Sequence, residues 1–188
     1  MAARILVTGP PGVGKTTVVR RVVEQLGLVA GGFWTEEIRE RGLRVGFRVT
    51  DLRTGREGVL AHVDHRGAPR VGKYGVDVEC FDRIGVAALR EAMEREGCIV
   101  IDEIGKMELR SKAFPEAVVR ALDSDHPVLG TLPVHEHPFV TALRQRQDIR
   151  VVRVAVGNRD RLPDPIAALL SAGPGSMDSR DTHGPQWL

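Results

Sequence analysis

The sequence has few of the residues from which small disulfide-bonded or zinc-stabilised domains are built. Its 188 residues include two cysteines, Cys80 and Cys98, which form no Cys-x-x-Cys pair. We therefore expect neither a disulfide framework nor a cysteine-bound zinc site, and we expect a reducing compartment, the cytoplasm. Aromatic residues make up 4% of the chain and the net charge is +2, so nucleic acid is not the expected partner.

Long hydrophobic runs are also missing. No apolar segment approaches the roughly 18 residues that a membrane-spanning helix needs, so we expect no membrane partner. The N-terminal segment MAARILVTG has no signal-peptide pattern and enters a predicted strand almost at once. With 42% hydrophobic residues, a chain of this length can bury one core. We expect a monomeric cytoplasmic enzyme with one domain over residues 1–172.

Segments with strand-like and helix-like patterns alternate along most of the chain. The segment RILVT is short, apolar and β-prone, and a helical stripe of valines at i and i+4 spacing follows it. The alternation predicts an α/β fold, with a mostly parallel sheet flanked by helices on both faces. The predicted strands are 4–8, 99–102, 127–131 and 149–156, and the predicted helices are 15–26, 82 to about 96 with Asp82 as N-cap, 113–122, 138–147 and 166–171.

Two regions depart from this alternation. In the first, β-rich pieces are separated by Arg41-Gly42 and Thr54-Gly55, which are hairpin-like turns. We predict an inserted antiparallel β meander of about residues 32–78, and the sequence leaves open whether it covers the core or contacts the substrate. In the second, residues 173–188, core-forming residues are few and Gly, Ser, Asp and Pro are many, so we predict a disordered tail.

The segment GPPGVGKT, residues 9–16, matches the phosphate-binding pattern G-x-x-x-x-G-K-[ST] and lies between a predicted strand and a predicted helix. Its glycines allow the backbone to direct several N–H groups at a phosphate, and the helix N-terminus adds partial positive charge. Lys15 can reach the β- and γ-phosphates, and the Thr16 hydroxyl can bind Mg²⁺. We therefore predict the P-loop NTPase fold. The predicted nucleotide-binding residues of this segment are Gly9, Pro10, Pro11, Gly12, Val13, Gly14, Lys15, Thr16 and Thr17.

A pair of acids follows an apolar strand in the segment CIVIDEIGKMEL, residues 98–109. P-loop enzymes place an acid at the end of a neighbouring strand to hold Mg²⁺, and Asp102 fits that position. Glu103 is expected on the opposite side of the extended chain, where it can position a water for attack on the γ-phosphorus. Because a transferase gains nothing from activating water, the pair favours hydrolysis. The alternative is that Glu103 is a surface carboxylate at the start of a helix.

Six segments together resemble a known family. GPPGVGKTT, GGFWTEEIR, VGKYGVD, VIDEIGKMEL, LGTLP and GNRDRL occur in this order over about residues 3–170. The set resembles the small nucleoside-triphosphatases first grouped around thermophile enzymes, whose vertebrate member is called cancer-related nucleoside-triphosphatase. The resemblance implies Mg²⁺-dependent hydrolysis of ATP, GTP, CTP, UTP and similar nucleoside triphosphates to diphosphate and phosphate, with low base selectivity and slow turnover.

The resemblance also implies where the nucleotide binds. In that family the segments matched by residues 9–16 and 98–105 form the nucleotide site, and the glutamate matched by Glu103 is the catalytic base. The residues that this adds to the predicted nucleotide site are Cys98, Ile99, Val100, Ile101, Asp102, Glu103, Ile104 and Gly105. The predicted metal ligands are Thr16 and Asp102.

Three further residues have two interpretations each. Lys106 lies four residues after Asp102 and can neutralise charge on the transferred phosphoryl group, or it is a solvated lysine. Asn158 and Arg159 follow a predicted strand, where P-loop folds often place the base or ribose, or else they cap a helix. The predicted catalytic residues are Glu103, Lys15 and Lys106.

Two other functions use the same phosphate loop. A kinase for a nucleotide or a small molecule would transfer the γ-phosphoryl group, and it would form diphosphate rapidly only with an acceptor. A nucleotide-dependent binding module, for RNA or a partner protein, would show an NTPase rate that its partner stimulates. The near-neutral charge and the few aromatic residues argue weakly against RNA.

Overall fold

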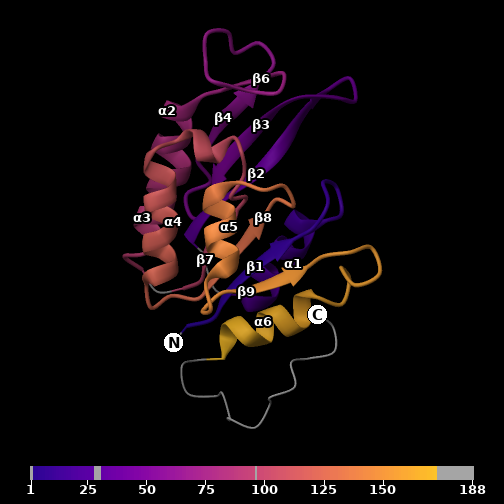
Figure 1. The fold of residues 1–188 in the computed structure, drawn as a ribbon, viewed down its shortest axis with the longest axis vertical. Helices are drawn as coiled ribbons and strands as arrows, with labels where there is room; N and C mark the ends of the chain where they lie inside the picture. The colour runs from indigo at the N-terminus through magenta and orange to yellow at the C-terminus, as the bar shows by residue number, and fades with distance from the viewer. Residues whose placement is uncertain (1, 28–30, 96, 173–188) are drawn as a thin grey trace.

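The computed structural model of the protein describes residues 2–27, 31–95 and 97–172, and its central feature is one mixed β-sheet (Figure 1). The strands are β1 (Arg4–Thr8), β2 (Gly31–Glu40), β3 (Leu43–Asp51), β4 (Glu57–His62), β5 (Arg70–Val71), β6 (Tyr74–Val76), β7 (Ile99–Asp102), β8 (Val128–Leu132) and β9 (Arg150–Arg153). Within the described residues the sheet order is β5-β6-β4-β3-β2-β7-β8-β1-β9. Strands β2, β7, β8, β1 and β9 pair in parallel, and the predicted α/β fold is confirmed.

Helices cover both faces of the sheet (Figure 1). On one face, α1 (Lys15–Leu26) and α6 (Pro163–Ser171) share a core with β1, β7 and β9. The other face is covered by α3 (Ala87–Ala92), α4 (Ala113–Asp123) and α5 (Pro138–Gln145). The shorter helical segments are α2 (Val78–Phe81), a π-helical segment (Asp82–Val86) and a 3-10 turn (Glu108–Arg110). None of the helices in the described segments is both long enough and apolar enough to cross a bilayer.

Side-chain alternation along the parallel strands builds the two cores. In β1, Ile5 and Val7 pack with α1 and α6, whereas Leu6 packs with α4 and α5 on the other face. Strand β7 repeats the arrangement, with Val100 on the α1 side and Ile101 on the other. Because successive side chains point to opposite faces, a strand that is apolar at every position is buried on both. The predicted strands 4–8 and 99–102 are confirmed.

The predicted antiparallel meander is confirmed as an extension of the main sheet. Strand β2 pairs in parallel with β7, which places Trp34 opposite Asp102, and the following strands continue antiparallel. The hairpin between β2 and β3 turns at Arg41 and Gly42, whose φ angles of 47° and 80° are the left-handed pair typical of a two-residue hairpin. Phe33 of β2 is fully buried. The meander is therefore part of the core, and its first strand lies beside the strand that carries Asp102.

The predicted helix from residue 82 to about 96 has the wrong start. The helical run begins at Val78, because Asp77 is the N-cap. Its carboxylate accepts a hydrogen bond from the Cys80 N–H in the first turn at 2.8 Å. Asp82 lies inside the helical run, where its carboxylate accepts a hydrogen bond from the Ser111 hydroxyl instead. The run ends at Ala92, and residue 96 lies outside the described residues.

Other boundaries differ from the prediction by a few residues. Helix α6 begins at Pro163 rather than at 166, because proline is tolerated in the first turn of a helix. Strand β9 ends at Arg153 rather than at 156, where a turn stabilised by Asn158 begins. The other predicted elements are confirmed with slightly shifted ends. The predicted disordered tail, residues 173–188, lies outside the described residues.

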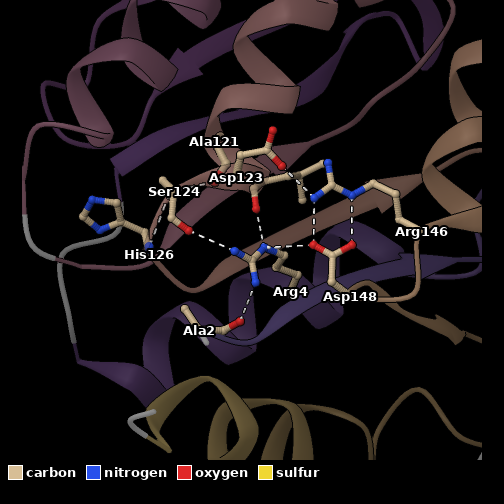
Figure 2. A network of polar contacts seen from close by, with 9 residues as sticks. Ala2, Arg4, Ala121, Asp123, Ser124, His126, Arg146 and Asp148 are labelled. Atoms are coloured by element: carbon tan, nitrogen blue, oxygen red, sulfur yellow. Dashed lines mark hydrogen bonds and ion pairs between the residues drawn. The ribbon is translucent and has the colours of Figure 1, made fainter.

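The amino end of the parallel strands is held by a network of charged side chains (Figure 2). Arg4, at the start of β1, donates to the Ser124 carbonyl oxygen at 3.0 Å and pairs with the Asp148 carboxylate at 3.5 Å. Arg146 donates to both Asp148 oxygens at 2.9 and 2.7 Å, and to Asp123 at 2.7 Å. Each of these four charged side chains has a partner of opposite sign. The network joins β1, the end of α4 and the segment that precedes β9.

Candidate active site

The loop between β1 and α1 has the geometry that phosphate binding requires. Gly12 and Gly14 have φ angles of 74° and 106°, left-handed values that residues with side chains rarely adopt. A methyl group on Gly9 would lie 2.6 Å from the Val154 carbonyl oxygen, so only glycine fits there. The loop leads directly into α1, whose first N–H groups have no partner within the helix and are available to an anion.

The remaining predicted residues of this loop differ in exposure. Pro10 and Pro11 are exposed, and the Pro10 carbonyl oxygen accepts a hydrogen bond from the Val13 N–H at 3.3 Å. The Val13 side chain packs in the core with α1, so only its backbone is available to a phosphate. Thr17 lines a cavity together with Gly14.

Lys15 folds back over the phosphate loop. Its Nζ donates to the Gly9 carbonyl oxygen at 3.1 Å and lies 3.8 Å from Glu103 Oε2. The side chain is 10% exposed, so water screens its charge only in part. The ammonium group therefore lies between the phosphate loop and the acids that follow β7.

Asp102 ends β7 as a buried carboxylate that is 1% exposed. Its Oδ1 accepts a hydrogen bond from Thr131 Oγ1 at 2.6 Å, whereas its Oδ2 has no hydrogen-bond partner among the described residues. Burial raises the pKa of Asp102, and Thr131, Thr16 and Lys15 oppose the rise. A buried carboxylate oxygen without a partner is destabilising, and a bound cation would remove that penalty.

The surroundings of Asp102 Oδ2 fit Mg²⁺. Thr16 is close enough to Asp102 to lower the pKa of its carboxyl group, so a hydroxyl and a carboxylate converge at this point. Mg²⁺ prefers oxygen ligands and usually combines one or two protein groups with water and substrate phosphates. Among the described residues, no group of three His, Cys, Asp or Glu side chains could hold a metal by itself. Thr16 and Asp102 are the residues that could hold Mg²⁺ together with a triphosphate.

Glu103 lies on the same side of the chain as Asp102, and the prediction that it points to the opposite side is wrong. Both carboxyl groups are close enough to Lys15 for its charge to lower their pKa. The strand ends at Asp102, so the alternation of an extended chain does not continue to the next residue. Burial raises the pKa of Glu103; Lys15 opposes the rise and Asp102 adds to it. Its side chain is 32% exposed, so water can reach the carboxylate.

The side chains of the apolar residues around these acids are packed in the protein interior. Each is at most 2% exposed and lies in the hydrophobic core. Of the predicted segment 98–105, the structure thus brings the side chains of Asp102 and Glu103 to Lys15, and the apolar side chains determine where these two acids stand. The buried apolar residues are Cys98, Ile99, Val100, Ile101 and Ile104.

Arg159 and Asn158, which the sequence groups together, have different surroundings. Arg159 Nη1 donates to the Val13 carbonyl oxygen at 3.3 Å, and the side chain lines a cavity of about 200 Å³ beside the phosphate loop. Asn158 holds a turn: its Oδ1 accepts from the Ala155 N–H at 2.8 Å, and its Nδ2 donates to the Arg153 carbonyl oxygen at 2.9 Å. These bonds hold a turn and not a helix end, because α6 begins at Pro163 with Leu162 as its N-cap, so they do not make Asn158 a helix cap. The other residues that line the cavity are Gly14, Thr17, Val18, Arg21 and Asp160.

Lys106 is exposed and lies toward the segment between β8 and α5. Burial lowers the pKa of His135 in that segment, and the Lys106 charge lowers it further. His137 in the same segment caps α5 by accepting a hydrogen bond from the Phe139 N–H at 3.2 Å. No ion pair joins Lys106 to an acid within the described residues. Its catalytic role stays a prediction.

Sequence reasoning missed Thr131 and Glu108. Thr131 reaches Asp102 because β7 and β8 are adjacent parallel strands, and that pairing is not visible in local sequence. Glu108 is 4% exposed, and burial raises its pKa to about 8, with the charges of Glu103 and Asp102 adding to the rise. Its only local signal is an acid between two apolar residues, Met107 and Leu109.

Comparisons with known proteins identify the family of the chain. The family model described as NTPase matches residues 4–167. Nucleoside-triphosphatase THEP1 of Thermofilum pendens is 48% identical over 173 residues, which cover 89% of this chain and 95% of that protein. Nucleoside-triphosphatase THEP1 of Thermotoga maritima is 41% identical over 167 residues, which cover 89% of this chain and 95% of that protein.

Two solved structures are similar as well. The crystal structure of THEP1 from the hyperthermophile Aquifex aeolicus has a TM-score of 0.81 and 39% identity, and the match covers 90% of this chain and 99% of that one. The solution structure of a human cancer-related nucleoside triphosphatase has a TM-score of 0.77 and 39% identity, with 90% and 98% covered. The resemblance found in the six sequence segments is confirmed, and the chain belongs to the NTPase family.

Proposed function

We propose that the protein hydrolyses nucleoside triphosphates to nucleoside diphosphate and phosphate, with Mg²⁺ as cofactor and low selectivity for the base. The proposed substrates are ATP, GTP, CTP and UTP. The observation that carries the proposal is the convergence of Lys15, Asp102 and Glu103 beside the phosphate loop. The similar proteins named nucleoside-triphosphatase support the same activity.

The phosphate loop and Lys15 are the proposed triphosphate ligands. The loop directs backbone N–H groups at the phosphates, and Lys15 supplies positive charge to the β- and γ-phosphates. Asp102 Oδ2 and the Thr16 hydroxyl would hold Mg²⁺, which when bound neutralises phosphate charge. Thr131 contributes by occupying the other oxygen of Asp102, which leaves Oδ2 free for a cation.

Glu103 is the proposed general base. Its carboxylate lies 3.8 Å from Lys15, the group that binds the γ-phosphate, and it is open to water. Lys15 favours the ionised form of Glu103, while burial makes the carboxylate more basic. Glu103 accepts a proton from the attacking water as the water oxygen bonds to the γ-phosphorus. The bond from that phosphorus to the β–γ bridging oxygen breaks, and the nucleoside diphosphate leaves.

The cavity beside Gly14 is the proposed site of the nucleoside. Arg159 and Arg21 both line it. Guanidinium groups can stack on the face of any base, because the attraction depends on the π-system more than on the edge of the ring. This lining supports binding of several nucleotides with low selectivity.

The test measures phosphate release from ATP, GTP, CTP and UTP with Mg²⁺ for the wild-type chain, Glu103→Gln and the matched control Glu94→Gln. Glu94 is exposed and follows α3. We expect Glu103→Gln to lower kcat by about 10²- to 10⁴-fold, the range that a general base contributes. Its affinity for a nonhydrolysable triphosphate should stay within about twofold, because the phosphate ligands are unchanged.

Wild-type turnover in Glu103→Gln would contradict the assignment of the base. Rapid diphosphate formation only with an added nucleoside monophosphate or small-molecule acceptor would favour the kinase alternative. A rate that rises many-fold with RNA or a partner protein would favour the binding module.

A further inference from the structure

Glu108 is a buried carboxyl group that the proposed reaction does not use. It begins the 3-10 turn Glu108–Arg110, and within the described residues no basic side chain forms an ion pair with it. Burying a carboxyl group without a cation is destabilising, and an apolar side chain of similar size would fill the same space without that penalty. The position therefore points to a role for the carboxyl group beyond packing.

Gly105 brings Glu108 and Glu103 together. A methyl group on Gly105 would lie 2.7 Å from Glu108 Oε2 and 2.8 Å from Glu103 Oε1. The two oxygens therefore flank the same point of the backbone, and they are separated by no more than the sum of those two distances. Glycine leaves this room, whereas a methyl group would force the ends of the two glutamate side chains to move, so the spacing E-x-G-x-x-E over residues 103–108 allows the two carboxyl groups to approach each other.

The backbone that carries both glutamates is held at several points. The Ile104 N–H donates to the Thr131 carbonyl oxygen of β8 at 2.9 Å, and the Leu109 N–H donates to the Gly105 carbonyl oxygen at 3.0 Å. Ser111 Oγ donates to the Asp82 carboxylate in the helical run that covers the sheet. Because neighbouring elements hold the segment on both sides of Gly105, its backbone does not readily shift to separate the two side chains.

The two glutamates differ in their charged neighbours. Burial raises the pKa of Glu108 to about 8, and the charge of Glu103 adds to the rise. Burial also raises the pKa of Glu103, and the Lys15 ammonium group at 3.8 Å opposes that rise. Burial and the nearby charge of Glu103 therefore both favour the neutral form of the Glu108 carboxyl group.

We propose that Glu108 is a positioning residue for Glu103: its carboxyl group, packed against the same glycine, holds the Glu103 carboxylate on the side that faces Lys15. The inference rests on the proposed function, since it assigns a partner to the proposed base. Glu108 has no contact with the phosphate loop in this scheme, so it affects turnover and leaves nucleotide binding alone. A misplacement of about 1 Å at a reacting group can lower a rate about 100-fold.

The test compares Glu108→Leu with Glu108→Gln in steady-state hydrolysis of ATP with Mg²⁺. Leucine keeps apolar volume and removes the polar contact, so kcat should fall at least about tenfold while KM stays within about twofold. Glutamine has the shape of the neutral acid, so Glu108→Gln should turn over at least about five times faster than Glu108→Leu. A kcat for folded Glu108→Leu within twofold of wild type, or equal rates for the two variants, would overturn the proposal.

A double variant separates positioning from general damage. In a Glu103→Gln background, Glu108→Leu should lower the residual rate by less than about twofold, because its effect passes through Glu103. A full further loss would overturn the proposal. If Glu108→Leu does not fold, Gly105→Ala replaces it in the test, because the added methyl group displaces both carboxyl groups. An unchanged kcat in Gly105→Ala would also overturn the proposal. Failure of the proposed function is recognised separately, because the wild-type chain would then release no phosphate from ATP without an added acceptor.

Discussion

The two ends of the parallel strands carry clusters of charged side chains, and the clusters differ in how their charges are balanced. At the amino end, two arginines and two aspartates alternate, and each lies within 3.5 Å of an opposite charge (Figure 2). At the carboxyl end, two of three neighbouring carboxyl groups lie near Lys15, and in the described residues Glu103 is the one of the three that forms an ion pair with it. The three are Asp102, Glu103 and Glu108.

The pKa values of the acids follow this difference. Hydrogen bonds from Arg146 lower the pKa of Asp148, whereas burial raises the pKa of the three acids at the carboxyl end. Folding therefore favours the charged form of Asp148 and disfavours the charged form of Asp102. In the cluster at the amino end, the charges neutralise one another, so the cluster stabilises the fold and has no unpaired charge for a ligand. In the cluster at the carboxyl end, the acids outnumber the cations, so the cluster weakens the fold slightly and is suited to binding a cation and to proton transfer.

The largest effect that separates the clusters is expected from Asp102→Asn. The substitution removes the charged oxygen that we propose binds Mg²⁺, so the Mg²⁺ concentration for half-maximal hydrolysis should rise about 10- to 100-fold. The same change removes a buried charge, so the ligand-free protein should be stabilised by about 1 kcal/mol, which raises Tm by about 2–4 °C. Magnesium titration of the rate and thermal unfolding without ligand measure the two effects. A lower Tm together with an unchanged Mg²⁺ requirement would contradict both assignments.

A smaller effect of opposite sign is expected from Asp148→Asn. Asparagine loses the charge that pairs with Arg146 and Arg4, so the free energy of unfolding should fall by about 1 kcal/mol, a value reduced because both partners of the closer pair are partly exposed. Hydrolysis should be unaffected, since the network lies at the other end of the strands. Denaturant unfolding and phosphate release test the two statements. An activity loss without a loss of stability would mean that the two ends are coupled.

The smallest expected effect is the pH dependence of the stability changes caused by Asp102→Asn and Asp148→Asn. Because the folded-state pKa of Asp148 is lowered, its stabilising contribution is present above the unfolded pKa of about 3.9 and is lost as pH falls through the folded pKa. The folded-state pKa of Asp102 is raised, so its destabilising contribution is full above that pKa and disappears as pH falls to the unfolded value. Both variants should therefore approach the wild-type Tm in acid, Asp148→Asn from below and Asp102→Asn from above. Differences that widen as pH falls would contradict this origin.

Much of the fold was predictable because its signals are local. The apolar strand, the glycine loop and the valine stripe that follow one another in residues 4–26 each depend on neighbours within a few positions, and all three are confirmed. The helix that follows the meander was predicted with the wrong start, since Asp77 and Asp82 are both suitable N-caps by residue type. Asp82 is instead bound by Ser111, a residue distant in sequence.

The candidate site was predictable only where one segment carries the chemistry. The loop lysine and the acids after β7 could be named from their own segments, but the side on which Glu103 lies could not. A strand period holds only while the strand continues, and β7 ends one residue earlier. Arg159 and Asn158 could not be separated by sequence, because their difference is in their contacts, one with the phosphate loop and one with its own turn.

The sequence by itself determined the phosphate loop, the alternation of strands and helices, and the presence of two acids at the end of a buried strand. These features depend on backbone freedom at glycine and on the periodicity of apolar residues, which act over short distances along the chain. Only the tertiary structure decided that Thr131 occupies one oxygen of Asp102, and that the carboxyl groups of Glu108 and Glu103 both lie beside Gly105. Those contacts depend on which strands and turns are adjacent in space, because burial and charge balance are set by all the elements that pack around a group.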